Sequence, residues 1–259
     1  VLIDRVDVRD ADATERALRS ADAVVHLAAA TRVVESIERP GEHLDTNVRG
    51  TFNVLEAMRR NGIETIVNAS TGGAILGDVE PPIDETMMPE PASPYGASKL
   101  AAEGFLSAYS GSYGLSCISL RFANVYGPGS RHKGSAVAAF MNRALAGEPI
   151  TVWGDGSQAR DFVHVRDICR GVALALESGL SGVYQLGSGR PTTLSELIGK
   201  IEAASGVSLE IDRQPARQGE VHRTWCRVDK AERDLGYRPE IALDDGLAET
   251  WAWFRGSGA

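Results

Sequence analysis

Short apolar runs alternate with helix-like patterns along the first half of the chain. Three runs have the length and composition of buried strands: residues 23–30 (AVVHLAAA), 63–70 (IETIVNAS) and 115–127 (LSCISLRFANVYG). Residues 40–62 and 94–113, which lie between them, have the spacing of apolar positions that is typical of helices. This alternation predicts an α/β fold with a parallel, doubly wound, Rossmann-like sheet and helices on both faces.

The expected helices have clear boundaries. Asn61-Gly62 ends the segment 40–62, and Pro94 stands near the first turn of the next helix. A shorter helix is expected over residues 10–19, and residues 1–8 are expected to be a strand already in progress. In the segment 40–62 the helical spacing places five apolar side chains on one face: Leu44, Val48, Phe52, Leu55 and Met58.

The organisation changes near Pro128. Residues 1–127 are expected to form the sheet domain, and residues 128–259 a smaller α+β lobe that interleaves with the last strands of the sheet. A Gly-Asp-Gly turn separates two β-like runs within residues 150–167. Helices are expected at residues 136–148, at residues 193–206, where Thr193 and Glu196 resemble a capping box, and at residues 229–237.

Composition narrows the class of protein. The net charge of −8 is unlike that of a general nucleic-acid binder, and no apolar run reaches the roughly 18 residues of a membrane helix. No signal peptide opens the sequence. Cys117, Cys169 and Cys226 form no CxxC pair, so no metal site is expected, and all three are interpreted as buried thiols in a reducing compartment. A cytoplasmic protein without a nucleic-acid or membrane partner is predicted.

Small and polar residues stand where three of the predicted strands end. Ala28-Ala29 follow the first apolar run, Ser70-Thr71 the second, and Asn124 lies near the end of the third. Ligands of parallel sheets bind outside the carboxyl ends of the strands. The sequence therefore predicts a ligand site at this edge of the sheet.

A tyrosine and a lysine stand four residues apart in SPYGASKL, residues 93–100. Side chains at positions i and i+4 of a helix lie on one face about 6 Å apart, so Tyr95 and Lys99 are expected to point into the same space. A nearby ammonium lowers the pKa of a phenol, and such a tyrosine can move a proton at a sugar or alcohol hydroxyl. Taken alone, such a pair is most often two surface residues; its position after the strand ending in NASTGG favours an acid–base pair.

Eight segments together resemble the extended short-chain dehydrogenase/reductase family, and within it the nucleotide-sugar epimerases and dehydratases. They follow the family's order and span nearly the whole chain: VDVRD, VVHLAA, NVRGTFNVLEA, NASTGGAILG, SPYGASKLAAE, RFANVYGP, GDGSQARDFVHVRD and PARQGEV. The resemblance implies an isomerase, an NAD-dependent nucleotide-sugar 4-epimerase of the UDP-glucose/UDP-galactose type. Residues 1–127 would then bind NAD, and residues 128–259 would mainly bind the nucleotide sugar.

The resemblance also implies the residues that contact NAD. Asp7 and Val8 match the family's contact with adenine, and Asn47 matches an asparagine that braces the catalytic loop. Lys99 matches a lysine that bonds the ribose beside the nicotinamide. The full implied set of cofactor-binding residues is Asp7, Val8, Leu27, Ala28, Ala29, Asn47, Tyr95, Lys99 and Phe122.

The substrate contacts are implied in the same way. Thr71, with Ser70 as its neighbour, matches a hydroxyl that bonds the reacting sugar hydroxyl, and Arg160 and Arg217 match arginines that clamp the diphosphate through bidentate bonds. Val152 is interpreted as either a wall beside the uracil or plain core. Thr224 stands where several relatives carry a tyrosine, which implies room for an N-acetyl group. The implied substrate-binding residues are Thr71, Asn124, Arg160, Arg217, Glu220 and Thr224.

In the implied mechanism Tyr95, Lys99, Thr71 and Ser70 are the catalytic residues, and Tyr95 takes the proton of the sugar 4-hydroxyl while the cofactor carries the hydride. No Asp-Glu pair follows Thr71, which favours an epimerase over a 4,6-dehydratase. A related dehydratase, reductase or uronate epimerase or decarboxylase, and a non-catalytic nucleotide-sugar-binding homologue, remain the alternatives. A homodimer is expected by analogy, through the helices around 47–59 and 95–113.

One part of the family's pattern is not found. Members open with a strand, a G-x-x-G-x-x-G loop and a helix, and the loop places the cofactor pyrophosphate on the helix N-terminus. This sequence begins where the third strand is expected, so we expect that the first βαβ unit, roughly 50 residues, is missing. A fragment of a complete enzyme and a truncated chain are both compatible with this. The residue that selects NAD over NADP would lie in the same unit.

Overall fold

The computed structural model describes residues 3–216 and 222–256. Its strands in chain order are β1 (Ala23–His26), β2 (Thr65–Thr71), β3 (Ser116–Phe122), β4 (Asn124–Tyr126), β5 (Ile150–Trp153), β6 (Ala159–His164), β7 (Gly182–Leu186), β8 (Pro191–Thr193), β9 (Ile211–Gln214) and β10 (Arg223–Thr224). Its helices are α1 (Ala11–Ala17), α2 (Val33–Glu38), α3 (Pro40–His43), the π-helical turn η1 (Leu44–Arg49), α4 (Gly50–Asn61), α5 (Gly72–Leu76), α6 (Pro94–Tyr113), α7 (Ala136–Ala146), α8 (Val165–Ser178), α9 (Leu194–Ser205), α10 (Asp229–Leu235) and α11 (Leu243–Gly256).

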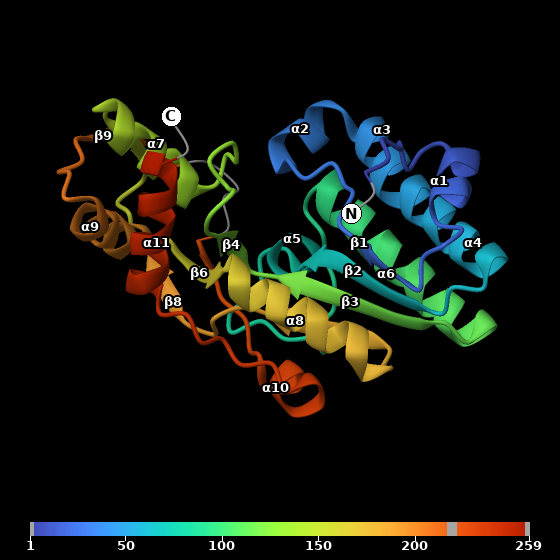
Figure 1. Ribbon diagram of the computed structural model, residues 1–259. Coiled ribbons are helices and arrows are strands. Elements are labelled where there is room, and N and C mark those ends of the chain that lie inside the picture. The colour runs from blue at the N-terminus through green and yellow to red at the C-terminus, as the bar shows by residue number, and fades with distance from the viewer. Residues whose placement is uncertain (1–2, 217–221, 257–259) are drawn as a thin grey trace.

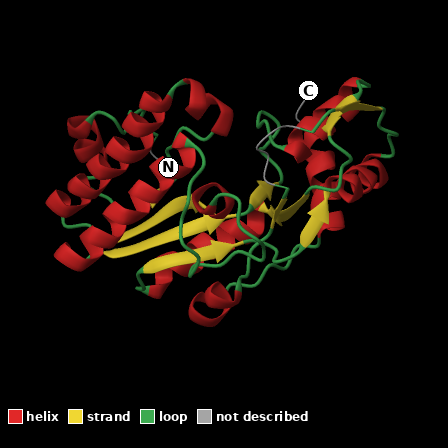
Figure 2. Cartoon of the chain, turned by 180° about the vertical axis from the view of Figure 1, so that it is seen from behind, coloured by secondary structure: helices red, strands yellow, loops and turns green. Residues whose placement is uncertain are grey.

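The main sheet has four strands in the order β1-β2-β3-β7, and all three pairings are parallel (Figure 1). Side chains of a strand alternate between its two faces. Ile66 of β2 packs with α4 and α6, whereas its neighbour Val67 packs with α8 and α10. Helices therefore cover both faces, and the prediction of a doubly wound parallel sheet is confirmed; the helical layers stand out against the strands in Figure 2.

The elements predicted for the first half of the chain form, except the strand over residues 1–8. The expected helix over 94–113 is α6, and Ser93 accepts a hydrogen bond from the backbone N–H of Gly96 at its start. The expected strand over residues 1–8 is wrong for its described part, because residues 3–10 contain no strand and their chain turns at Asp7. The Asp7 carboxylate accepts hydrogen bonds from Arg9 within that turn.

The predicted helix over 40–62 is divided by a π-helical turn. Its three parts are α3, η1 and α4, and the wider turn of η1 rotates the residues after it relative to those before it. Leu55 and Met58 are fully buried as expected, but Leu44 is 56% exposed and Phe52 39% exposed. The single apolar face predicted for the segment is therefore wrong.

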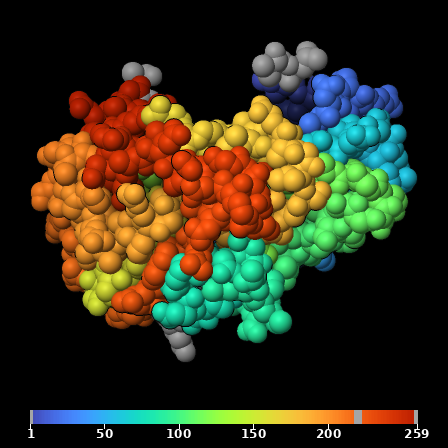
Figure 3. Space-filling model, turned by 90° about the horizontal axis from the view of Figure 1, so that it is seen from below, coloured from blue at the N-terminus to red at the C-terminus, as the bar shows by residue number. Residues whose placement is uncertain are grey.

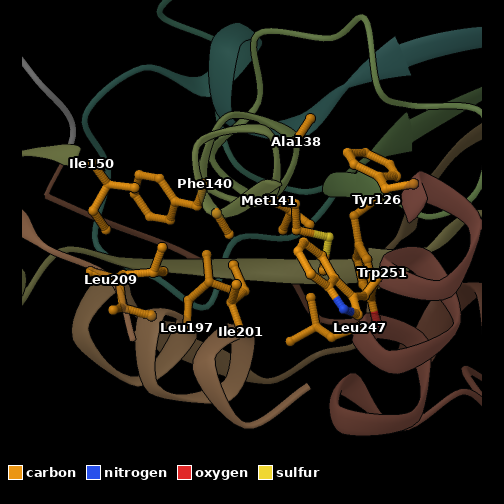
Figure 4. Close-up of a cluster of buried hydrophobic side chains, with 14 of the residues drawn as sticks. Tyr126, Ala138, Phe140, Met141, Ile150, Leu197, Ile201, Leu209, Leu247 and Trp251 are labelled. Carbon is orange, nitrogen blue, oxygen red and sulfur yellow. The ribbon is translucent and has the colours of Figure 1, made fainter. Parts of the chain in front are cut away.

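The second lobe packs around a core of its own (Figure 4). Its largest buried side chains come from α7, α9 and α11 and from the strands beside them: Tyr126, Phe140, Met141, Ile150, Leu197, Ile201, Leu247, Trp251 and Phe254. The two β-like runs flanking the Gly-Asp-Gly turn form β5 and β6, but β5 pairs with β9 while β6 pairs with β4, β8 and β10. The capping box predicted at Thr193 and Glu196 is present.

The chain returns from the second lobe to the first. After β6 it forms α8, which packs on the main sheet, and then β7, which adds the strand next to β3. Helix α10 follows later and packs against the same face; in Figure 3 it is the red segment beside the yellow-orange α8. The two lobes are therefore interleaved along the sequence.

Three findings concern the predicted class of protein. No helix among the described residues is long and apolar enough to cross a membrane. The three cysteines are free thiols, and Cys169 is exposed, which corrects the interpretation that all three are buried. Within the same residues no group of three or more His, Cys, Asp or Glu side chains is arranged to hold a metal ion.

Candidate active site

A cleft opens at the carboxyl ends of β2 and β3, between the two lobes. Its cavity of about 590 Å³ is lined by Thr71, Phe122, Asn124, Arg160 and Thr224, together with residues of α2, α5 and the segment after β10. A second cavity of about 350 Å³ lies against the core of the second lobe. Asn124 and Arg160 line both cavities, so the two lie side by side and meet at these residues.

Tyr95 and Lys99 lie on the face of α6 that meets the sheet. Lys99 is only 6% exposed, and its Nζ donates a hydrogen bond to the carbonyl oxygen of Ala69 at 3.0 Å. Tyr95 stands one turn nearer the helix start and is bonded to the side chain of Thr71, a wall residue of the cleft. The predicted pair is therefore brought together at the strand ends, beside the cavity.

In the protein without a bound cofactor, burial is the largest influence on the pKa values of Tyr95 and Lys99. It raises the pKa of Tyr95 above its usual value of 10.0, and the hydrogen bond with Thr71 opposes this increase. It also lowers the pKa of Lys99 from 10.5 to about 8, against the attraction of Glu103. The expectation that Lys99 makes Tyr95 more acidic is therefore corrected: burial raises the pKa of the phenol, and Thr71 rather than Lys99 opposes the increase.

Ser70 and Thr71 point to opposite sides of the strand. The Ser70 hydroxyl donates a hydrogen bond of 2.6 Å to Glu103 beneath α6, and the residue is 5% exposed. Thr71, next along the strand, lines the cleft. Because side chains alternate along a strand, only one of two neighbours can face the cleft. Thr71 is that residue, and Ser70 is corrected from a catalytic to a structural position.

Glu103 and Arg121 form a buried ion pair behind the site that the sequence analysis missed. Their side chains are 5% and 4% exposed, and the contact between Arg121 Nη2 and Glu103 Oε2 is 2.7 Å. A second hydrogen bond, of 3.0 Å, runs from Arg121 Nε to Glu103 Oε1. The position of Glu103, four residues after Lys99 on the same helix face, was the available signal.

Asn47 braces the loop after β1. Its side chain is 1% exposed, exchanges two hydrogen bonds with the backbone of Ala30, and donates a third to the Ser98 hydroxyl. The structure thus gives Asn47 the bracing position, with its amide turned into the protein. His43, another residue missed from sequence, is buried with its ring edge-on to that of Tyr95, the centroids 6.0 Å apart.

The end of β1 fits a flat cofactor. Leu27 is 62% exposed, Ala28 is exposed and Ala29 is half-buried, which leaves an open apolar ledge where the backbone can be approached closely. Rings and sugars of a dinucleotide suit such a surface. Val8 packs behind the ledge, and Asp7 is half-exposed, with Arg9 lowering the pKa of its carboxyl to about 2.

The predicted substrate residues divide into three groups. Asn124, Arg160 and Thr224 line the cleft. Arg217 and Glu220 lie outside the described residues. Val152 is 1% exposed within the second core, so it is not a wall of the site. Its neighbours along β5, Thr151 and Trp153, line the second cavity instead, because side chains alternate along a strand.

Asp161, which was not predicted from the sequence, joins β6 to the loop after β7 and to the segment after β10. It is 1% exposed and accepts five hydrogen bonds, from the backbone N–H groups of Ser188, Gly189 and Cys226 and from the side chains of Ser188 and Cys226. Burial and the charge of Asp161 raise the pKa of the Cys226 thiol well above its usual range. The carboxylate therefore holds the cleft wall and is saturated in doing so.

A parallel doubly wound sheet with a Tyr–Lys pair one helical turn apart at its carboxyl edge is typical of the short-chain dehydrogenase/reductase fold. The model of the NAD dependent epimerase/dehydratase family matches residues 2–187, and the chain belongs to this family. The predictions of the family and of NAD as its cofactor are thereby confirmed.

The similar proteins with curated names include both epimerases and dehydratases. The chain is 37% identical over 253 residues to a putative UDP-glucose 4-epimerase of Methanocaldococcus jannaschii, covering 96% of this chain and 82% of that protein. It is also 35% identical to a dTDP-glucose 4,6-dehydratase of Streptomyces antibioticus, covering 97% of this chain and 75% of that protein. These relatives are named as enzymes, and their names give different substrates and different reactions.

Two solved structures share the whole described fold. The UDP-glucose 4-epimerase of Thermotoga maritima, crystallised with UDP-glucose, is 35% identical with a TM-score of 0.96 and covers 99% of this chain and 85% of its own. That of Thermus thermophilus, in complex with NAD, is 40% identical with a TM-score of 0.92 and covers 98% and 84%. The predicted Rossmann-like fold agrees with both.

Proposed function

We propose that the protein is an NAD-dependent nucleotide-sugar 4-epimerase that acts on a UDP-hexose by transient oxidation at sugar C4. The observation that carries the proposal is the junction of two cavities beside a Tyr–Thr pair: Thr71 bonds Tyr95 at the larger cavity, and Arg160 stands where the two cavities meet. The similarity to UDP-glucose 4-epimerases supports the same reading.

The shape of the site suits a sugar, a diphosphate and a base in sequence. The larger cavity, next to Thr71, has room for a hexose, and the smaller one, lined by Phe140 and Trp153, for a flat base. Arg160 lies at the junction with Asn124, where a guanidinium can bind phosphate oxygens in a bidentate manner. A nucleoside diphosphate sugar spans these three places.

NAD would lie on the ledge of Leu27 and Ala28, with its nicotinamide end near Lys99. When bound, NAD would supply the reversible hydride acceptor that oxidation at sugar C4 requires. Thr71 orients the reacting hydroxyl, and Tyr95 takes its proton. Burial keeps the pKa of Tyr95 above its usual value in the protein alone, and the Lys99 ammonium, one turn along α6, would stabilise the phenolate as it forms during the reaction.

The acids of the cleft favour epimerisation over dehydration. Elimination of water from the sugar needs a carboxylic acid or a similar group that can protonate the leaving hydroxyl. Among the described residues that line the larger cavity, Asp161 is the one carboxylate, and all of its oxygen contacts serve the protein. Gly72 and Gly73, which follow Thr71, add no acid. A proton shuttle through Tyr95 alone suffices for a 4-epimerase.

A homodimer is proposed on the outer surface of α4 and α6. Phe52 and Phe105 are 39% and 37% exposed, and their rings are in contact across the two helices with centroids 5.8 Å apart. Helix pairs of this kind form a bundle when two copies bring the same face together.

Substitution Tyr95→Phe tests the proposed function. It removes the group that accepts the sugar proton and leaves the ring, so conversion of UDP-galactose to UDP-glucose should fall by roughly 10²–10⁴-fold. Binding of UDP, measured by calorimetry, should stay unchanged, because Arg160 and Asn124 are untouched. A wild type that binds UDP-sugars but converts none of them would favour the non-catalytic alternative.

The two neighbouring hydroxyls give a matched pair of variants. Thr71→Ala removes the bond to the reacting hydroxyl and should lower kcat roughly tenfold to a hundredfold with little loss of stability. Ser70→Ala should instead lower the free energy of unfolding by about 1–3 kcal/mol, because Glu103 loses a buried donor. Urea denaturation and steady-state kinetics measure both. Equal kinetic losses in the two variants would contradict the assignment of Thr71.

Thr224 tests the room for an N-acetyl group. It lines the cleft beside Gly73, where an added Cβ would come within 3.1 Å of Thr224 Cγ2. Wild type should convert UDP-N-acetylglucosamine as well as UDP-glucose, and Thr224→Tyr should lower kcat/KM for the N-acetyl sugar at least tenfold more than for UDP-glucose. Thr224→Val, of equal size, should leave the ratio unchanged. Complete exclusion of the N-acetyl sugar by wild type would refute the idea.

Light scattering after size-exclusion chromatography tests the dimer. Wild type should elute with twice the mass of one chain, and Phe105→Glu, which places a charge in the proposed interface, should elute as a monomer. Met88→Glu is the control, because Met88 is 77% exposed on a loop away from these helices. A monomeric wild type would remove the proposal.

A further inference from the structure

Three side chains of α6 follow one another at intervals of four residues: Tyr95, Lys99 and Glu103. Residues at this spacing lie on one face of a helix, and here that face lies on the main sheet, beside β2 and β3 (Figure 1). Tyr95 and Lys99 belong to the proposed active site. Glu103 is the next member of the row, and the proposed mechanism gives it no part.

The Glu103 carboxylate is buried and held from two strands. It is 7% exposed as a residue and accepts a hydrogen bond of 2.6 Å from Ser70 of β2. Arg121 of β3 donates two more, of 3.0 and 2.7 Å. Ser70 and Arg121 face each other across the parallel pairing of the two strands, which places both donors under the same point of α6.

These hydrogen bonds fix the position of α6 along β2, near the carboxyl end of the strand. Lys99 donates to the carbonyl of Ala69, and Glu103 accepts from Ser70 one residue further along β2. Two successive residues of the strand are therefore tied to two successive turns of α6. Thr71 is the next residue of the strand, so the same contacts set where Tyr95 stands relative to Thr71.

The charges around Lys99 give Glu103 a second effect. The ammonium is buried, and the titratable groups near it are Tyr95 and Glu103 on α6, His26 at the end of β1, and Arg121 on β3 beyond Glu103. His26 donates from Nε2 to Thr51, whose own hydroxyl proton goes to the carbonyl of Asn47. Burial and the charge of Lys99 lower the pKa of His26 to about 4, so its ring is neutral. Glu103 is therefore the anion of this group.

We infer that Glu103 is a positioning residue of the active site: its carboxylate, held by Ser70 and Arg121, fixes α6 on the sheet and supplies the negative charge that keeps the buried Lys99 ammonium in place. A buried cation without a counter-charge is strongly disfavoured. The activity measurements rest on the proposed function, whereas the titration of Lys99 does not.

The pH dependence follows from the direction of the Lys99 shift. Its pKa in the folded protein is about 8, so the ammonium is present below that pH and is lost as the pH rises through it. Glu103 opposes the lowering caused by burial. Removing the Glu103 charge must move the loss of the ammonium to lower pH, and the alkaline limb of a reaction that needs Lys99 must move with it.

Titration of Lys99 by NMR tests this without turnover. The sequence contains four lysines, so protein labelled with ¹³C at lysine Cε gives few signals, and a Lys99→Arg sample assigns the one from Lys99. In Glu103→Gln the midpoint of Lys99 should fall by roughly one pH unit, and the alkaline limb of kcat should fall equally. Glu103→Asp, which keeps the charge but shortens the side chain, should restore the midpoint and lower kcat.

Asp167→Asn is the matched control. Asp167 is also a buried carboxylate paired with an arginine, Arg170 at 2.9 Å, but it lies on α8 against the opposite face of the sheet. It should lose stability like Glu103→Gln and leave the Lys99 midpoint unchanged. If Glu103→Gln does not fold, because Arg121 is left unpaired, Glu103→Gln with Arg121→Met removes both charges and should still lower the midpoint.

The outcomes separate the inference from the proposed function. An unchanged Lys99 midpoint in Glu103→Gln, or in the double variant, would overturn the inference whatever the activity. A midpoint that falls equally in Asp167→Asn would also overturn it, since the effect would then be general loosening. A lowered midpoint in a protein that converts no nucleotide sugar would support the inference and sink the proposed function.

Discussion

The hydrogen bond from the Lys99 ammonium to the carbonyl oxygen of Ala69 joins the helix that carries the tyrosine to the strand that ends at the cleft. It places a cation in a buried site, and the rest of the region is arranged around that cation. Glu103 balances it, Arg121 and Ser70 hold Glu103, and His26 is kept neutral beside it. A parallel sheet makes this possible because the carboxyl ends of β1, β2 and β3 meet at one edge.

The cleft depends equally on the second lobe. Asp161 connects β6 to the loop after β7 and to Cys226, and these are segments from three distant parts of the chain. Arg160, next to it on β6, faces the junction of the two cavities. The same short strand thus carries one side chain that is buried and holds the protein together and one that lines both cavities, as strand alternation allows.

The sequence predicted what depends on local spacing. The strands that become β1, β2 and β3, the α6 helix with Tyr95 and Lys99 on one face, and the capping box at Thr193 follow from local patterns of residues, and these predictions agree with the structure. The strand predicted for residues 1–8 does not. The sequence did not predict η1, because a π-turn changes the number of residues per turn without a distinct residue type. The pairing of Glu103 with Arg121 was missed for another reason: the two are 18 residues apart on different elements. The choice between Ser70 and Thr71 needed the direction of each side chain on β2.

The interleaving of the lobes has a consequence for the synthesis of the chain. The main sheet gains β7 only after residue 186 has been made, and α10, which covers the same sheet face, comes later still. Residues 1–127 therefore leave the ribosome with β3 as an open edge and with the apolar face of β2 and β3 uncovered. Such an edge can pair with other chains until the rest of the protein arrives. The late C-terminal segments thus protect the early ones, and the nascent chain is most exposed to aggregation while the second lobe is being translated.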